Sequence, residues 1–121
     1  MTSVLARFAR SEPTVCAVCH RHAVWLGYRP THRGPIIWLC EDNSCHAGAR
    51  KVYGIAQGRL DAYELGAALE AGADAGGYLD EIGKTDTAQL TSEEWREFLR
   101  RVVVGFEHAL RRMILQHEPP F

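Results

Sequence analysis

A chain of 121 residues with 46% hydrophobic and 24% charged residues has the size of one globular domain, which excludes a disordered polypeptide. No apolar stretch approaches the roughly 18 residues of a membrane span, so we expect no membrane contact. The N-terminus has no apolar signal-peptide centre, so we expect a cytoplasmic protein. Residues 1–60 carry eight Lys or Arg against three acids, and residues 61–121 carry six against twelve, balances of +5 and −6. This asymmetry favours contact between the halves, or two faces for different partners.

The four cysteines form two close pairs with 20 residues between them. The pairs are Cys16 with Cys19 and Cys40 with Cys45. Each pair bends the chain into a knuckle, and four thiolates fill the tetrahedral shell that Zn²⁺ adopts in proteins. Because such a site has no open position for a substrate, the sequence predicts one Zn²⁺ with a structural role.

Other uses of these cysteines stay open. Two disulfides suit secreted domains, a redox Cys-x-x-Cys pair belongs in a βαβ unit, and an iron–sulfur cluster also takes four thiolates. His46 follows Cys45 directly, and its imidazole could replace that thiolate as the fourth ligand. Zinc bound by the four cysteines is the interpretation we prefer.

The residues around the cysteines predict a hairpin and a helix. Residues 23–28 and 36–39 have strand composition, and the segment between them is rich in Pro and Gly. The residues that follow Cys45 are expected to form a helix, with Asp42, Asn43 or Ser44 as its N-cap and Cys45 in its first turn. Knuckle, hairpin, knuckle and helix is the order of a treble-clef zinc finger. A zinc ribbon, with a third strand in place of the helix, is the alternative.

Two helices are predicted in the second half. Asp61 and Glu64 resemble a capping box that starts a helix ending at Gly83. The many small residues of this helix, glycines and alanines, make a smooth face that requires a closely packed neighbour. The neighbour is expected over roughly residues 92–116, after a second capping box at 91–94. We expect burial of four of its large residues: Trp95, Phe98, Val102 and Phe106. Its apolar stripe exceeds what one helix covers, so a homodimer through this C-terminal helix is an option.

These elements add up to an α+β fold, with a small four-cysteine, treble-clef-like zinc finger packed on a two-helix C-terminal body. We expect residues 1–121 to form a single domain. Within it, residues 1–15 form an N-terminal segment, residues 16–60 the zinc-binding module and residues 61–118 the helical body.

The sequence also resembles a family of small zinc-finger proteins, of unknown activity, from phages and prophages of proteobacteria. The resemblance runs from about residue 16 to residue 110. It is carried by Cys16-x-x-Cys19-x-Arg21-x-Ala23-x-x-x-Gly27-Tyr28, by Trp38-x-Cys40, by Cys45, and by Gly77-Tyr78-Leu79-Asp80-x-x-Gly83-Lys84-Thr85-Asp86, Leu90 and Glu94-Trp95. The chain departs from the pattern in the four residues between Cys40 and Cys45, where three are expected, and in His20, where glycine is expected. The resemblance implies a phage context and no particular activity.

For function, the sequence favours a protein without enzymatic activity that binds a host or defence-complex protein, as anti-CRISPR proteins do. The alternative is nucleic-acid binding by the basic half, in which arginines contact phosphates and aromatic rings stack on bases. A nuclease built around a second metal is a third reading, without a recognisable motif. The residues we expect to contact a partner are Arg21, Trp25, Tyr28, Arg29, Arg33, Trp38, Arg50 and Lys51.

Overall fold

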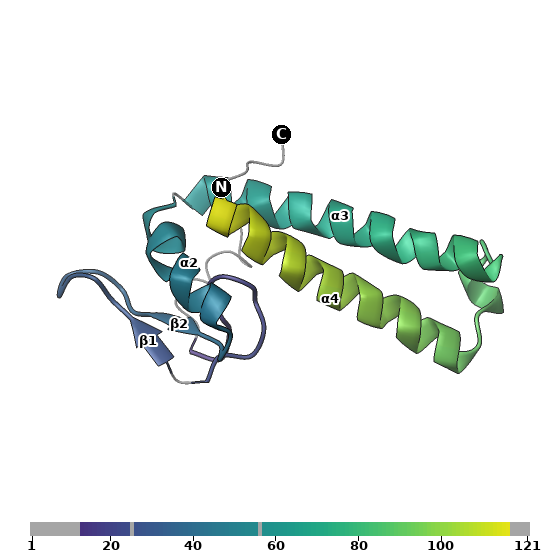
Figure 1. The fold of residues 1–121 in the computed structure, drawn as a ribbon, viewed down its shortest axis with the longest axis horizontal. Helices are drawn as coiled ribbons and strands as arrows, with labels where there is room; N and C mark the ends of the chain where they lie inside the picture. The colour runs from purple at the N-terminus through teal and green to yellow at the C-terminus, as the bar shows by residue number, and fades with distance from the viewer. Residues whose placement is uncertain (1–12, 25, 56, 117–121) are drawn as a thin grey trace.

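The computed structural model describes residues 13–24, 26–55 and 57–116. In chain order the elements are β1 (Leu26–Tyr28), β2 (Ile37–Leu39), α2 (Asn43–Gly54), α3 (Gln57–Ile82), the 3-10 turn η1 (Thr87–Gln89) and α4 (Ser92–Gln116). Figure 1 shows α3 and α4 side by side as a long helical pair, with the hairpin and α2 at the end where α3 begins and α4 ends. This hairpin-and-helix unit on a two-helix body confirms the predicted α+β fold class.

The hairpin is short and antiparallel. Leu26 faces Leu39, Gly27 faces Trp38, and Tyr28 faces Ile37. The ladder is only three residues long on each side, shorter than the predicted 23–28 and 36–39. A Cβ on Gly27 would lie 3.0 Å from the Ile36 Cγ2, so glycine leaves room for this side chain of the facing segment. The chain therefore turns back in a compact ribbon that leads directly from one cysteine pair to the other.

Helix α2 begins at Asn43, so Cys45 lies in its first turn, and its cap is one of the three predicted residues. Asp42 is its N-cap, and the Asp42 side chain accepts a hydrogen bond of 2.8 Å from the Ser44 backbone N–H. Its buried face, which includes Ala49 and Val52, packs toward the rest of the core. Near the other end of α2, the Tyr53 hydroxyl donates to the Pro35 carbonyl at 2.8 Å and so fastens the hairpin turn to the helix.

Helix α3 begins four residues earlier than predicted. It starts at Gln57, so Asp61 and Glu64 lie inside the helix and are not a capping box. Burial of Leu60, three residues before the fully buried Tyr63, explains this start, because both side chains lie on one helical face in the core. The predicted end is confirmed: Gly83 has φ of 70°, the left-handed conformation of a glycine that terminates a helix.

The close contact between α3 and α4 runs through alanines. Ala67, Ala71 and Ala75 are fully buried, and a Cβ on Gly105 of α4 would lie 3.3 Å from the Ala71 Cα. The predicted contact through small residues is therefore present in its alanines, whereas Gly72, Gly76 and Gly77 lie beside open space. The helices approach closely at Gly105 and Ala71.

Helix α4 has the bounds that its sequence predicts. The Thr91 side chain accepts from the Glu94 N–H at 3.1 Å, and Glu94 accepts from the Thr91 N–H at 2.9 Å, which completes the capping box. The predicted burial is wrong for Trp95, which is 43% exposed, and Phe98, Val102 and Phe106 are only partly buried. The core residues of α4 lie in its last turns, among them Leu110 and Ile114.

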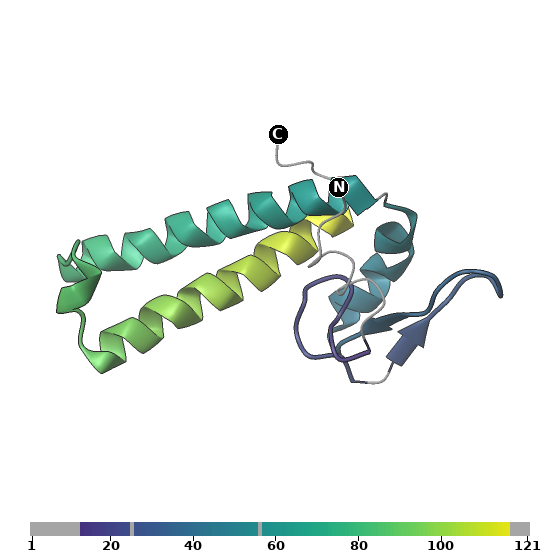
Figure 2. The same ribbon diagram turned by 180° about the vertical axis from the view of Figure 1, so that it is seen from behind.

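The core sits where the three helices meet the hairpin (Figure 2). Val18 and Ile37 come from the cysteine-bearing half, Tyr63 comes from α3, and Leu110 from α4. One continuous cluster thus joins both halves of the chain. The far end of the helical pair, near η1, contributes no residue to this cluster. There α3 and α4 pack against each other and not against the hairpin or α2.

Candidate metal centre

The first cysteine pair forms a tight knuckle. The Cys16 carbonyl accepts from the His20 N–H at 3.0 Å, and the Cys16 N–H donates to the Arg21 carbonyl at 2.8 Å. To close this turn, His20 adopts φ of 68°. Glycine takes this left-handed conformation with less strain than histidine does. Cys16 and Cys19 are fully buried by the turn.

The second pair joins a strand to a helix. Cys40 directly follows β2, and Cys45 lies in the first turn of α2, whose N-terminal dipole stabilises a thiolate. The four intervening residues contain Asp42, the cap of α2. They therefore form the cap and the first turn of the helix, so the longer spacing is accommodated.

The four sulfurs gather at one point. Their Sγ atoms all lie within 4.8 Å of one another, the four residues are buried, and all are free thiols. A Zn–S bond of about 2.3 Å implies about 3.8 Å between two sulfurs of a tetrahedral site. The Cys19 and Cys40 Sγ atoms are 3.8 Å apart. These four residues thus form a metal-binding site, and no other cluster of ligand-type side chains occurs in the described ranges.

The thiols influence one another strongly. A hydrogen bond from the Cys19 thiol is the main reason that the pKa of Cys16 is well below its usual range. Donation to Cys16 raises the pKa of Cys19 to about 12 and raises the pKa of Cys45 as well. One thiolate is thus stabilised by its protonated neighbours. Without a cation, ionisation of one thiol makes ionisation of its neighbours unfavourable. A divalent cation offsets this repulsion, because its charge stabilises several thiolates together.

The histidines around the site have other partners. His46 Nε2 lies 2.8 Å from the Cys40 carbonyl oxygen, so the imidazole supports the knuckle through the backbone. His20 points away from the sulfurs toward the helical pair, with Nε2 3.5 Å from Glu64 Oε1 and its ring 5.6 Å from the Phe106 ring. The four sulfurs are the ligand set that this geometry brings together.

One side chain at the site was not predicted. Arg111 of α4 donates from Nε to the Cys45 Sγ at 3.2 Å, and its Nη2 lies 3.7 Å from Asp42 Oδ2. In the sequence, Arg111 belongs to the polar face of an amphipathic helix, which normally faces solvent. The contact depends on the tertiary packing of α4 against the start of α2, which the sequence pattern does not give.

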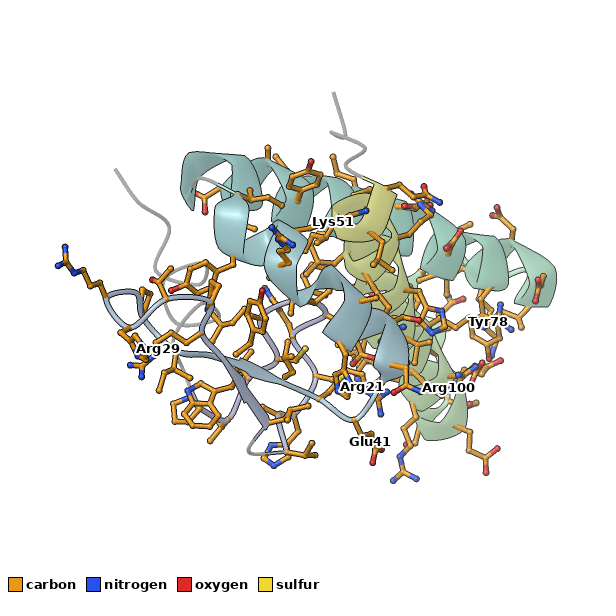
Figure 3. The ribbon with its side chains drawn as sticks, turned by 60° about the vertical axis from the view of Figure 1, so that its left-hand side comes forward. Arg21, Arg29, Glu41, Lys51, Tyr78 and Arg100 are labelled. Carbon is orange, nitrogen blue, oxygen red and sulfur yellow. The ribbon has the colours of Figure 1, made fainter. Side chains whose placement is uncertain are left out.

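The predicted partner-binding residues do not share one face (Figure 3). Arg29 lies at the exposed hairpin tip, where Arg33 is also exposed, and the ion pairs of the described residues include neither. Lys51 donates to the Leu115 carbonyl beside the end of α4. Arg21 lies at the other end of α2 and pairs with Glu107 at 3.6 Å. The basic residues are therefore dispersed.

The remaining predicted contact residues have mixed surroundings. The Tyr28 ring meets the Tyr53 ring edge-on at 6.0 Å, Trp38 is partly buried, and Arg50 is exposed. Trp25 lies outside the described residues. Three apolar side chains of the hairpin region are exposed, namely Val24, Leu26 and Ile36. The outside of the hairpin thus carries apolar residues near its arginine-bearing tip.

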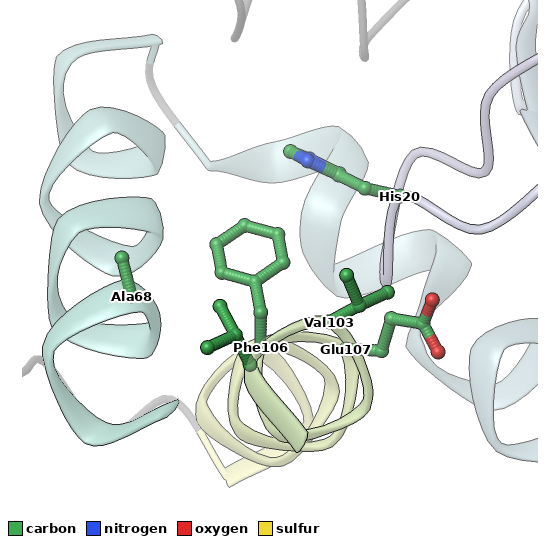
Figure 4. Close-up of a pocket in the computed structure, with 6 residues that line it drawn as sticks. His20, Ala68, Val103, Phe106 and Glu107 are labelled. Carbon is green, nitrogen blue, oxygen red and sulfur yellow. The ribbon is translucent and has the colours of Figure 1, made fainter. Parts of the chain in front are cut away.

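An apolar surface that the sequence only partly indicates lies on the helical pair. Trp95, Leu99 and Val103 recur every four residues on α4, and Leu65 and Leu69 do so on α3, all between 41% and 60% exposed. We call the three residues of α4 the helical apolar surface, because Leu65 and Leu69 each lie two residues from the buried Ala67 and so face away from α4. Beside it, a pocket of about 280 Å³ opens between the helices and His20 (Figure 4). It is lined by His20, Ala68, Val102, Val103, Phe106 and Glu107.

Within the described ranges, every helix is too short or too polar to cross a lipid bilayer. In comparisons with known proteins, the model of a family of unknown function (DUF6511) matches residues 59–121. No curated protein and no solved structure matches the chain. The family match covers 63 of 121 residues and begins after the last cysteine, so it covers α4 with Arg111 but none of the four thiols.

Proposed function

The chain belongs to the family of unknown function whose model matches its helical half, and from this premise we propose that it is a small zinc-binding interaction protein without enzymatic activity. In this proposal one Zn²⁺ is held by Cys16, Cys19, Cys40 and Cys45. Support comes from the all-thiolate donor set and from the spacing of the sulfurs. The ion stabilises the module and leaves no coordination position for a substrate, as in a treble-clef finger.

The observation that carries the interaction is the helical apolar surface. Leu99 and Val103 are 41% and 56% exposed, although apolar side chains that recur on one face of paired helices usually face a core. Contiguous apolar patches on soluble proteins commonly mark protein-binding sites. The pocket beside Val103 and Phe106 suits one apolar anchor of a partner.

The partner in this proposal is a host or defence-complex protein, bound in the cytoplasm of the host cell. The support here is the resemblance to small zinc-finger proteins of phages and prophages. Phage proteins of this size often act by occupying a surface on a host complex, as anti-CRISPR proteins do. A second copy of the chain could use the same surface, which would give the homodimer considered above.

Nucleic-acid binding is the second candidate, favoured by one observation: Arg29 and Arg33 are exposed at the hairpin tip and belong to no ion pair among the described residues. A backbone-tracking surface needs several cations on one face. Arg21 is paired with Glu107, and Lys51 bonds α4, which leaves few cations for such a surface. We therefore rank it below protein binding.

The metal is tested by elemental analysis of the purified protein, which should return about one Zn²⁺ per chain. Cys40→Ser should lose most of the metal and lower the melting temperature, because it removes one of four ligands. The matched control is Ser44→Cys, whose new sulfur adds no ligand to a filled site and should leave the stoichiometry unchanged. Metal-free wild-type protein with an unchanged melting curve would contradict the assignment.

The interaction is tested with Leu99→Asp combined with Val103→Asp. Both side chains are exposed, so the double variant should fold and keep its zinc, yet it should lose the protein captured from prophage-bearing cells. Val24→Asp, on an exposed residue of the other module, is the control and should retain capture. Light scattering of the pure protein distinguishes a partner from a second copy. One result would favour the second candidate: salt-dependent DNA binding that is lost when Arg29→Glu and Arg33→Glu are combined. Such binding should be unaffected by Leu99→Asp with Val103→Asp.

A further inference from the structure

Arg111 joins the helical pair to the metal module across 66 residues of sequence. Its guanidinium donates to the Cys45 Sγ at 3.2 Å and lies 3.7 Å from the Asp42 carboxylate. The side chain is only 12% exposed, so this is a positioned contact and not a surface arginine that happens to lie nearby. Arg111 of α4 thereby contacts two residues at the start of α2, the N-cap Asp42 and Cys45 of the first turn.

The sulfurs of the first knuckle have different hydrogen-bond donors. Backbone N–H groups of Val18 and Cys19 act electrostatically on the Cys16 sulfur and that of Arg21 on the Cys19 sulfur, which the Arg111 guanidinium also influences. These backbone groups come from the knuckle itself and would be present in the module alone. Cys45 instead receives a charged side chain from α4.

A cationic donor suits this place for an electrostatic reason. Four thiolates around a divalent cation carry a net charge of −2, and all four cysteines are buried. Burying such an anion is unfavourable unless donors and positive charges surround it. Arg111 supplies both, and the Asp42 carboxylate fixes the guanidinium from its other side.

We infer that Arg111 is a positioning residue of the metal centre, which holds the Cys45 sulfur for the ion and fastens the metal module to the helical pair. The inference rests on the proposed metal site. It makes the helical half, which the family match covers, part of the metal centre's surroundings. Metal binding and the docking of α4 then stabilise each other, because one contact serves both.

The chain contains a matched control for this residue. Arg112, the next residue on α4, makes two hydrogen bonds to the Glu70 carboxylate, at 2.7 and 2.8 Å. Those bonds lie within the helical pair and involve no sulfur. Arg111→Gln and Arg112→Gln therefore remove the same charge from the same helix, and they differ in the group that each arginine contacts.

The experiment measures zinc affinity by competition with a chromophoric chelator, and alkylation of each cysteine in the zinc-loaded protein by mass spectrometry. Arg111→Gln should weaken zinc binding by about 10- to 100-fold, the usual effect of losing an outer-shell partner. It should also raise the alkylation rate of Cys45 relative to Cys16 in the same sample, because the hydrogen bond no longer shields that sulfur. Arg112→Gln should change neither quantity.

Arg111→Lys covers the case in which the glutamine variant does not fold. Lysine keeps the charge but lacks the planar donor, so affinity should fall between wild type and Arg111→Gln, and the thiolate-to-metal charge-transfer band of Co²⁺-loaded protein should shift. Unchanged affinity, Cys45 reactivity and Co²⁺ spectrum in the folded variants would overturn the inference and leave the zinc proposal standing. Wild-type protein that binds no metal would overturn both.

Discussion

Glu64 is a carboxyl group held where its charge is unfavourable. Its side chain is 14% exposed and lies 3.5 Å from His20 Nε2. Burial, and then repulsion from Asp61, raises the pKa of Glu64 from 4.5 to about 7. Burial also lowers the pKa of His20, so the imidazole offers little positive charge near neutral pH. The folded protein therefore retains the Glu64 proton to a higher pH than the unfolded chain does.

This pKa predicts how stability responds to pH. A pKa raised on folding favours the folded state at low pH, and that contribution is lost as the pH rises from about 4.5 to about 7. Glu64→Gln should therefore stabilise the protein at pH 8.5, by about 1–3 kcal/mol, and much less at pH 5.5. Thermal unfolding at the two pH values measures the difference.

The control for this prediction is Glu70→Gln. Glu70 lies on the same helix, but hydrogen bonds from Arg112 lower its pKa, so neutralising it should not stabilise the protein at high pH. An equal effect of Glu64→Gln at both pH values would show that the carboxyl is as easily ionised as in the unfolded chain.

At the level of single residues, the sequence predicts the metal ligands but not their surroundings. The spacing of Cys16, Cys19, Cys40 and Cys45 is a local signal, because each pair lies within one turn. Arg111 gives no such signal, since it is 66 residues from Cys45 and has the pattern of a solvent-facing helix residue. The sequence also suggests His46 as a possible ligand, but its imidazole bonds the Cys40 carbonyl. The direction in which that side chain points cannot be read from the sequence.

Among the elements, the contact of α3 with α4 depends on one glycine. A Cβ at Gly105 would lie 3.3 Å from both Cα and Cβ of Ala71, so a larger side chain must push the helices apart. Gly105→Leu should destabilise the protein by about 1–3 kcal/mol, as overpacking does. Chemical denaturation measures this effect.

Gly72→Leu is the matched control, because a Cβ at Gly72 meets open space. It should leave stability unchanged or raise it, since leucine favours a helix more than glycine does. Equal destabilisation by both substitutions would mean that α3 and α4 do not approach closely at Gly105.

The helices also show which parts of an element can be predicted. The ends of α4 follow from local chemistry, the capping box at Thr91 and Glu94, and they agree with the structure. The burial of Trp95 does not follow, because the stripe it belongs to continues beyond the point where the metal module ends. The start of α3 was missed because Leu60 extends the helix through a tertiary contact.

Across the whole molecule, removal of the metal should act unevenly. The module of the hairpin and α2 has its core around the buried cysteines, whereas the far part of the helical pair is held by contacts between α3 and α4. With a strong chelator, amide hydrogen exchange should accelerate most in residues 43–54 and 109–116, and least in residues 92–101. Uniform acceleration along the chain would show that the protein unfolds as one unit. Re-addition of zinc is the control and should restore protection.

The contact between Cys45 and Arg111 has a consequence for how the protein is made. A ribosome adds about 5–20 residues per second, so the 66 residues between them take about 3–13 s to synthesise. All four cysteines leave the ribosome before α4 does. The four sulfurs are therefore available to an ion several seconds before the Arg111 guanidinium can reach Cys45.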